Sequence, residues 1–161
     1  LFSRPSAART GRQRKLTGSE KRTNEVMAIE LVVVTPEGEA LSETVQQVVL
    51  PGEAGDFGVL ESHERFLTPL SLGPMEIIRD SGNEWAAITS GFAEVDGTRC
   101  VVLVDSCTLA SDVDKGAVEA SKAEADGELS SLPDDEANAG ERARLAGVVA
   151  RAELELDVAS R

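Results

Sequence analysis

Aromatic residues are scarce in this chain of 161 residues, which holds no tyrosine, one tryptophan, four phenylalanines and a single histidine. Tyr, Trp and His often form the polar walls of ligand pockets, and His is the most frequent general acid or base in catalysis. Their scarcity argues against a freestanding all-β binding or enzyme domain with a helical tail. It also means that a core, which 41% hydrophobic residues can support, must be built mainly from Val, Leu, Ile and Ala.

Catalytic and nucleotide-binding motifs are missing as well. No GxxxxGK[S/T] phosphate loop occurs, so nothing in the sequence indicates an ATPase. Ser62 precedes His63, but the pair has no dedicated acid, which favours a structural or interface histidine. Cys100 and Cys107 have no CxxC spacing and no histidine nearby in sequence, which favours two reduced, buried thiols over a disulfide. We expect no catalytic residue, no metal and no cofactor.

Long hydrophobic runs are absent too. No run approaches the roughly 18 to 20 apolar residues that span a bilayer, so we expect membrane contact only through partner proteins. The net charge is −13, and because residues 1–26 carry seven Lys/Arg against two Glu, residues 27–161 carry −18. A body this acidic repels nucleic acid, whose binding depends on neutralised phosphates.

Short aliphatic runs alternate with turn signals from Ile29 to about Leu109. The runs are 29–34, 44–50, 57–60, 66–70, 75–79, 85–89, 92–95 and 100–104. Asp96-Gly97 is the clearest hairpin turn. Eight short strands without an intervening helix predict an all-β sandwich or barrel over residues 27–111.

The pattern changes to a charged, alanine-rich tail over residues 112–161, which predicts a two-helix antiparallel hairpin. Asp112 or Asp114 is the expected N-cap of a helix to about Leu129. Pro133-Asp134-Asp135 breaks the chain and is expected to cap a second helix, whose apolar stripe holds Leu145, Val148, Val149, Ala152 and Leu156. Two such marginal helices need a surface, either the sandwich or another protein.

The most informative segment is a glycine-rich loop between two apolar runs, which predicts two strands and a tight turn. It reads Leu50-Pro51-Gly52-Glu53-Ala54-Gly55-Asp56-Phe57-Gly58-Val59-Leu60-Glu61-Ser62-His63, with Leu67-Thr68-Pro69-Leu70 close behind. With Ile29–Val34, Ser90-Gly91-Phe92-Ala93-Glu94-Val95 and the tail, it closely resembles the epsilon subunit of bacterial F-type ATP synthases, called delta in mitochondria. Where that family usually reads Pro-Gly-His-x-Pro, this chain reads Glu61-Ser62-His63-Glu64-Arg65, so both prolines are lost.

The resemblance implies a non-catalytic central-stalk (rotor) subunit that couples c-ring rotation to the catalytic head through the gamma subunit. The matching c-ring loop is Glu53, Ala54, Gly55 and Asp56, whose carboxylates could pair with ring cations; the alternative is a solvated turn. The matching gamma interface is His63, Phe66, Leu67 and Thr68; the alternative is that the apolar members fill the core.

The resemblance also implies that the hairpin inhibits ATP hydrolysis by extending into the alpha/beta head. Arg142, Arg144 and Arg151 would then meet an acidic segment of the beta subunit, whereas the alternatives are ordinary helix-surface charge and a hairpin that does not inhibit. Some members bind ATP through Asp-x-x-Arg-Ala. Counting from Asp114, this chain has Ala117 and Val118 at the last two positions, so we do not expect it to sense ATP.

Residues 1–26 are expected to be a disordered basic extension, since they lack hydrophobic periodicity. Met27-Ala28-Ile29-Glu30-Leu31 resembles a natural start in the family, which favours an upstream extension or a misplaced start codon over an organelle transit peptide. The implied location is the cytoplasmic face of a bacterial plasma membrane, as a peripheral subunit. If residues 1–26 are a transit peptide, the implied location is an organelle inner membrane.

Overall fold

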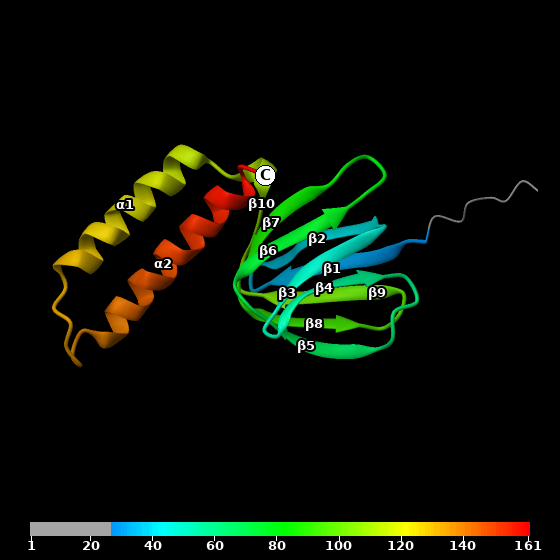
Figure 1. Ribbon diagram of the computed structural model, residues 1–161, viewed down its shortest axis with the longest axis horizontal. Coiled ribbons are helices and arrows are strands. Elements are labelled where there is room, and N and C mark those ends of the chain that lie inside the picture. The colour runs from blue at the N-terminus through cyan, green and yellow to red at the C-terminus, as the bar shows by residue number, and fades with distance from the viewer. Residues whose placement is uncertain (1–26) are drawn as a thin grey trace, which may run out of the picture.

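The computed structural model describes residues 27–161, so the predicted extension over residues 1–26 lies outside the described residues (Figure 1). Ten strands precede a short 3-10 helix, η1 (Ala110–Asp112), and two α-helices, α1 (Lys115–Ser131) and α2 (Ala139–Val158). The strands are β1 (Ile29–Thr35), β2 (Gly38–Val45), β3 (Gln47–Gly52), β4 (Gly55–Leu60), β5 (Phe66–Leu70), β6 (Gly73–Ile78), β7 (Glu84–Ile88), β8 (Gly91–Val95), β9 (Arg99–Val104) and β10 (Cys107–Leu109).

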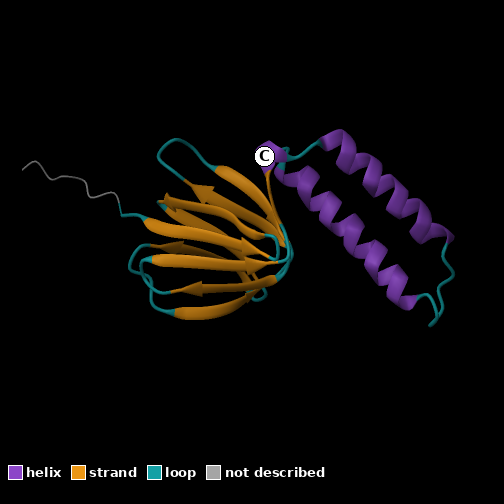
Figure 2. Cartoon of the chain, turned by 180° about the vertical axis from the view of Figure 1, so that it is seen from behind, coloured by secondary structure: helices purple, strands orange, loops and turns teal. Residues whose placement is uncertain are grey.

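The strands follow the order β10-β7-β6-β3-β5-β8-β9-β1-β2, with β4 paired to β3. All neighbours are antiparallel except β1 and β9, which run parallel. β3 meets β5 through the single register pair Gly52–Leu70, so the sheet folds over at this corner into two layers. The nearly closed sandwich, followed by a helical hairpin (Figure 2), confirms the predicted fold class.

Aliphatic side chains fill the space between the two layers, as the composition predicts. Ile29, Leu31, Val48, Leu50 and Ile77 are completely buried. The aromatic rings of Phe57 and Phe66 pack against this core but stay partly exposed, meeting edge to face with centroids 5.7 Å apart. Such a core depends on the alternation of side chains along each strand rather than on large anchors.

Both cysteines are free, as predicted. Cys100 is fully buried on β9, and Cys107 is half-buried on β10. Burial raises the pKa of the Cys100 thiol to about 12 and that of the Cys107 thiol to about 11. The neutral thiol therefore predominates at physiological pH, and the side chains act as small apolar groups.

Two strands escaped the sequence analysis, both at the ends of the strand order. β2 is largely exposed and reads Gly-Glu-Ala-Leu-Ser-Glu-Thr-Val, so only its last two residues fell within the predicted run 44–50. β10 has three residues, too few for a periodic pattern. Edge strands have one side without a neighbour and are often short or polar, which removes the signal that identifies central strands.

The predicted start of the second helix is wrong. Asp114 caps α1 as expected, because its carboxylate accepts a hydrogen bond from the Ala117 amide at 3.0 Å. α2, however, begins after Asn138, whose side chain makes no capping hydrogen bond. Asp135 instead accepts a hydrogen bond from the Asn138 amide at 3.0 Å and so stabilises the turn before the helix.

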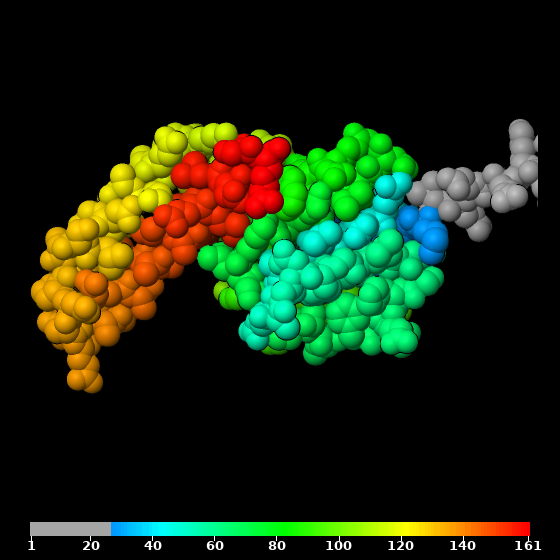
Figure 3. All heavy atoms as spheres, in the orientation of Figure 1, coloured from blue at the N-terminus to red at the C-terminus, as the bar shows by residue number. Residues whose placement is uncertain are grey.

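The hairpin projects from one end of the sandwich (Figures 1 and 2). The last turns of α2 lie against β7 and β6, where Glu155 and Val158 are buried. On the face seen in Figure 3, the red C-terminal end of α2 meets the green strands while the rest of the hairpin extends away. The helices therefore pack mainly on each other and only by one end on the sandwich.

Candidate protein-binding surfaces

The loop residues Glu53, Ala54, Gly55 and Asp56 form the tip of the β3–β4 hairpin, and all four are exposed. Gly55 adopts a φ of 125°, which strongly favours glycine. A Cβ on Gly52 would lie 2.7 Å from the Gly55 carbonyl oxygen, so the opposite position also requires glycine. The two glycines hold a tight tip on which the Glu53 and Asp56 side chains face solvent.

The four residues matched to a gamma interface do not share one surface. His63 is exposed in the loop after β4, and its ring lies edge to face on Phe66, with centroids 5.1 Å apart. Phe66 packs against the core and Thr68 is half-buried. Leu67, on the other side of β5, is 67% exposed. The loop lacks the family prolines, but the Ser62 amide donates a hydrogen bond to the Gly97 carbonyl at 2.7 Å.

An apolar row that the sequence analysis missed crosses the outer face of the sheet beside Leu67. Register pairs join Pro69 to Phe92, Phe92 to Leu103, and Leu103 to Val34, so four strands contribute neighbouring side chains. Phe92 is 52% exposed and Leu103 45% exposed. The signal in the sequence was alternation: because Ala93 and Val95 point inward, Phe92 must point outward.

The three arginines of the second helix have different neighbours. Arg142 donates hydrogen bonds from its guanidinium to the carbonyls of Leu129 and Leu132, at 3.2 and 2.8 Å, and so closes the last turn of α1. Arg144 pairs with Glu141 three residues earlier, and this hydrogen bond raises the pKa of the Arg144 guanidinium. Arg151 pairs with Glu155 four residues later.

A groove between the helices is lined by apolar side chains, Asp114, Ser121, Arg151 and Glu155. Two carboxylates face it for one guanidinium, and Arg151 already pairs with Glu155 at 3.0 Å. A phosphate in this groove would lie beside two like charges, which supports the expectation that the chain does not sense ATP. Within residues 27–161, no group of three or more His, Cys, Asp or Glu side chains could hold a metal ion.

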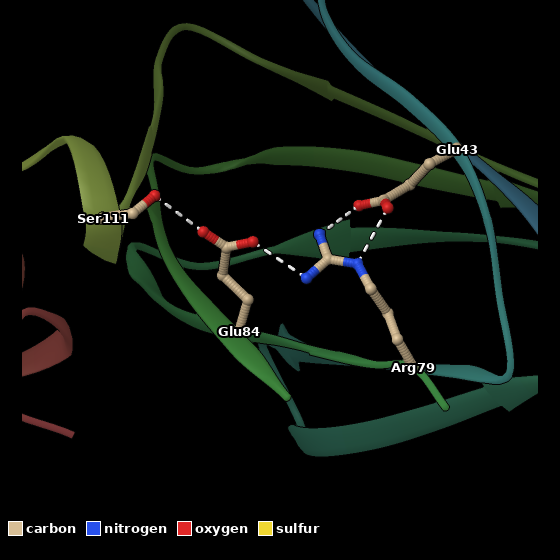
Figure 4. Close-up of polar contacts among 4 residues, drawn as sticks. All are labelled: Glu43, Arg79, Glu84 and Ser111. Carbon is tan, nitrogen blue, oxygen red and sulfur yellow. Dashed lines mark hydrogen bonds and ion pairs between the residues drawn. The ribbon is translucent and has the colours of Figure 1, made fainter. Parts of the chain in front are cut away.

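A polar network connects the sandwich to the segment before α1 (Figure 4). Arg79 donates to Glu43 on β2 and to Glu84 on β7, both at 2.8 Å, and Ser111 donates to Glu84 at 2.8 Å. Burial alone would raise the pKa of the Glu84 carboxyl, but the hydrogen bonds from Ser111 and Arg79 outweigh it and lower that pKa. The hydrogen bond to Glu43 raises the pKa of the Arg79 guanidinium.

A β-sandwich with an exposed apolar row, an acidic hairpin tip and a projecting pair of helices defines a protein-binding module. No helix in the described part of the chain is long and apolar enough to cross a membrane. Residues 28–110 match the family model of the ATP synthase delta/epsilon chain, beta-sandwich domain.

Curated relatives extend the match along the chain. The ATP synthase epsilon chain of Anaeromyxobacter dehalogenans (strain 2CP-1) is 35% identical over 136 residues, covering 84% of this chain and all of the relative. That of Magnetococcus marinus is 38% identical over 107 residues, covering 66% of this chain and 78% of the relative. A chain of the Euglena gracilis mitochondrial ATP synthase matches with a TM-score of 0.57 and 22% identity, covering 83% of this chain and 78% of that one, which supports the fold alone.

The chain therefore belongs to the ATP synthase delta/epsilon family. It is a non-catalytic central-stalk subunit of an F-type ATP synthase. The predicted family and the central-stalk role are confirmed, and the alternative of a freestanding binding or enzyme domain is set aside.

Proposed function

We propose that the sandwich joins the gamma subunit to the c-ring, so that ring rotation driven by protons becomes torque on the catalytic head. The observation that carries this proposal is the apolar row Pro69, Phe92, Leu103 and Val34, in which Phe92 and Leu103 are exposed, on a chain otherwise rich in surface charge. Exposed apolar rows of this kind mark protein interfaces. Since the family is that of a central-stalk subunit, gamma is the partner that this row fits.

In this proposal Leu67, Phe92 and Leu103 contact gamma directly. Their side chains all leave the outer face of neighbouring strands and are 67%, 52% and 45% exposed. Phe66 and Thr68 point toward the inner side of β5 and act by fixing the position of Leu67. His63 contributes from the rim, where its exposed ring rests on Phe66.

The acidic tip of the β3–β4 hairpin is the proposed contact with the c-ring. Glu53 and Asp56 present two carboxylates within four residues, and neither belongs to any ion pair of the described residues. They are free to pair with cations on the polar loops of the ring. Such rim contacts are worth little singly, so the shape of the tip must also contribute.

Replacing Gly55 by valine should weaken assembly with the ring by about tenfold, because a side chain at φ 125° costs on the order of 1–3 kcal/mol of strain. Proton pumping driven by ATP in reconstituted vesicles measures the coupling. Gly82→Val is the matched control, since Gly82 has a φ of 123° and open space around it in the β6–β7 turn. Normal coupling in Gly55→Val would remove the tip from the ring contact.

The hairpin is proposed to restrain ATP hydrolysis by extending into the alpha/beta head. Arg144 and Arg151 lie seven residues apart, close to two helical turns, so they share one face of α2, with exposed fractions of 58% and 49% for their side chains. Arg142 closes the hairpin instead, so its part is to keep the two helices together. An acidic segment of the beta subunit is the proposed partner of the Arg144 and Arg151 face.

Arg144→Gln should raise the rate of ATP hydrolysis by the assembled enzyme severalfold, because it removes a cation worth on the order of 1 kcal/mol at such a contact. The matched control is Glu141→Gln, which removes the partner of Arg144 and leaves its charge available to the beta subunit. Hydrolysis should then stay at or below the wild-type rate. Equal rates in all three proteins would favour a hairpin that does not inhibit.

The proposed location is the cytoplasmic face of a bacterial plasma membrane, where the subunit is held by its partners. The support is that the chain is similar along most of its length to bacterial epsilon chains.

A further inference from the structure

The contact between the hairpin and the sandwich is small and largely polar. α2 reaches β7 and β6 with its last turns, where the buried apolar side chain is that of Val158. The large apolar residue Leu145 is buried farther along, between the helices. Little apolar area therefore holds the hairpin to the sandwich, so polar groups must decide how firmly it stays.

The first polar group is Arg161, which follows α2. Its guanidinium carbon lies 4.3 Å from the centre of the Trp85 ring, and its Nη2 atom is 2.8 Å from the Asp157 carboxylate. Trp85 is the only tryptophan of the chain. Trp85 lies on β7 opposite Glu76 of β6, and α2 contacts β7. A guanidinium over an indole ring is an attractive contact in either exposed or desolvated surroundings.

The second is Glu155, the only charged residue that is buried among residues 27–161. Its carboxylate accepts a hydrogen bond from the Thr108 hydroxyl on β10 at 3.1 Å and one from Arg151 at 3.0 Å. A buried carboxylate that loses one hydrogen-bond partner raises the free energy of the docked hairpin. In the released hairpin the same carboxylate is hydrated by water. The Thr108 hydroxyl therefore favours the docked position over the released one.

The point at which the hairpin leaves the sandwich is fixed by Ser111 in η1, which the Glu84, Arg79 and Glu43 network ties to β7 and β2 (Figure 4). Beyond it, Val113 and Asp114 are extended and lead directly into α1. This short extended link is where the chain can turn without breaking a helix or a strand. The hydrogen bonds of Arg142 and the buried side chains of Ala125 and Leu145, which line one groove between the helices, keep the helices paired during such a turn.

We propose that Arg161 on Trp85 and Glu155 on Thr108 form a latch that holds the hairpin docked and sets how often it swings free about Val113 and Asp114. The inference deepens the proposed role of the hairpin, because a hairpin must leave β7 before α2 can reach another subunit. The latch itself is a property of the isolated chain and can be tested without gamma, ring or catalytic head.

Acrylamide quenching of Trp85 fluorescence in the full chain measures the released population, because the ring gains solvent when α2 departs. Thr108→Val keeps the size of the side chain, removes the hydroxyl donor and should raise the quenching constant at least about twofold. Arg144→Gln is the control, since its partner Glu141 lies on the same helix, and it should quench as the wild type does.

Arg161 touches the Trp85 ring, whose fluorescence is the readout. The Arg161 variant is therefore tested by a distance measurement instead. Spin labels at Glu37→Cys and Ala146→Cys, both exposed sites, with Cys100→Ala and Cys107→Ser, report the separation of hairpin and sandwich. Arg161→Gln should add a population at a new distance. Unchanged quenching in Thr108→Val, with one unchanged distance in Arg161→Gln, would overturn the latch.

The same variants separate the latch from the function of the hairpin. In the assembled enzyme, Thr108→Val should change the rate of ATP hydrolysis together with the quenching. If quenching rises but hydrolysis stays constant, the latch stands and inhibition by the hairpin fails. Thermal melting followed by circular dichroism is the control for folding, because a variant that melts as the wild type does has an intact sandwich.

Discussion

Replacing Gly91 by alanine is expected to destabilise the sandwich by about 3 kcal/mol or more and to lower its melting temperature by roughly 10 °C. A Cβ at this position would lie 1.9 Å from the Leu103 carbonyl oxygen and 2.9 Å from its carbonyl carbon. Both atoms belong to the backbone of β9, which also pairs with β1, so they cannot move without shifting two strands. Thermal unfolding followed by circular dichroism measures the loss.

Gly127→Ala is the matched control for this substitution. Gly127 lies inside α1, and a Cβ there would meet nothing within 4 Å. Alanine is the better helix former by roughly 1 kcal/mol, so this variant should melt at or above the wild-type temperature. If Gly91→Ala melted within about 2 °C of the wild type, the close approach of β8 to β9 described above would be wrong.

Phe92→Glu is expected to weaken binding of the gamma subunit by at least about a hundredfold while leaving the fold intact. Aromatic side chains at the centre of an interface contribute on the order of 2–4 kcal/mol, and a carboxylate there must also lose its water. Phe92 is 52% exposed and pairs with Pro69 and Leu103, so it is at the middle of the apolar row. Titration calorimetry with purified gamma gives the dissociation constants.

Leu60→Glu provides the comparison, because Leu60 is also a large apolar residue and is 45% exposed, but it lies on β4. It should bind gamma within about twofold of the wild type. Equal weakening of gamma binding by Phe92→Glu and Leu60→Glu would indicate a general surface effect. Unchanged binding in both variants would remove the apolar row from the interface.

The sequence predicted the architecture well where periodicity and turn residues agree. The buried run Ile29–Val34, the Asp96-Gly97 turn and the Asp114 cap are local features, and each was found where expected. β2 and β10 were missed because an edge strand has no need of an alternating apolar pattern. The cap of α2 was misplaced because Asp135 and Asn138 are both good capping residues, and only the turn geometry decides between them.

The binding surfaces were harder to predict because they combine residues from distant strands. Pro69, Phe92 and Leu103 become neighbours only through strand register, which one sequence does not reveal. The loop Glu53–Asp56 was easier, since its exposure follows directly from a tight turn. The sequence also gave no sign that Arg142 closes the hairpin or that Glu155 is buried, because both depend on how α2 packs.

The most direct test of the central-stalk assignment is to purify the full chain together with the gamma subunit and measure the mass of the product by light scattering. The account predicts a complex of one chain with one gamma subunit that survives size-exclusion chromatography, and that binds c-rings through the β3–β4 tip. Separate elution of the two proteins at micromolar concentration would contradict the account.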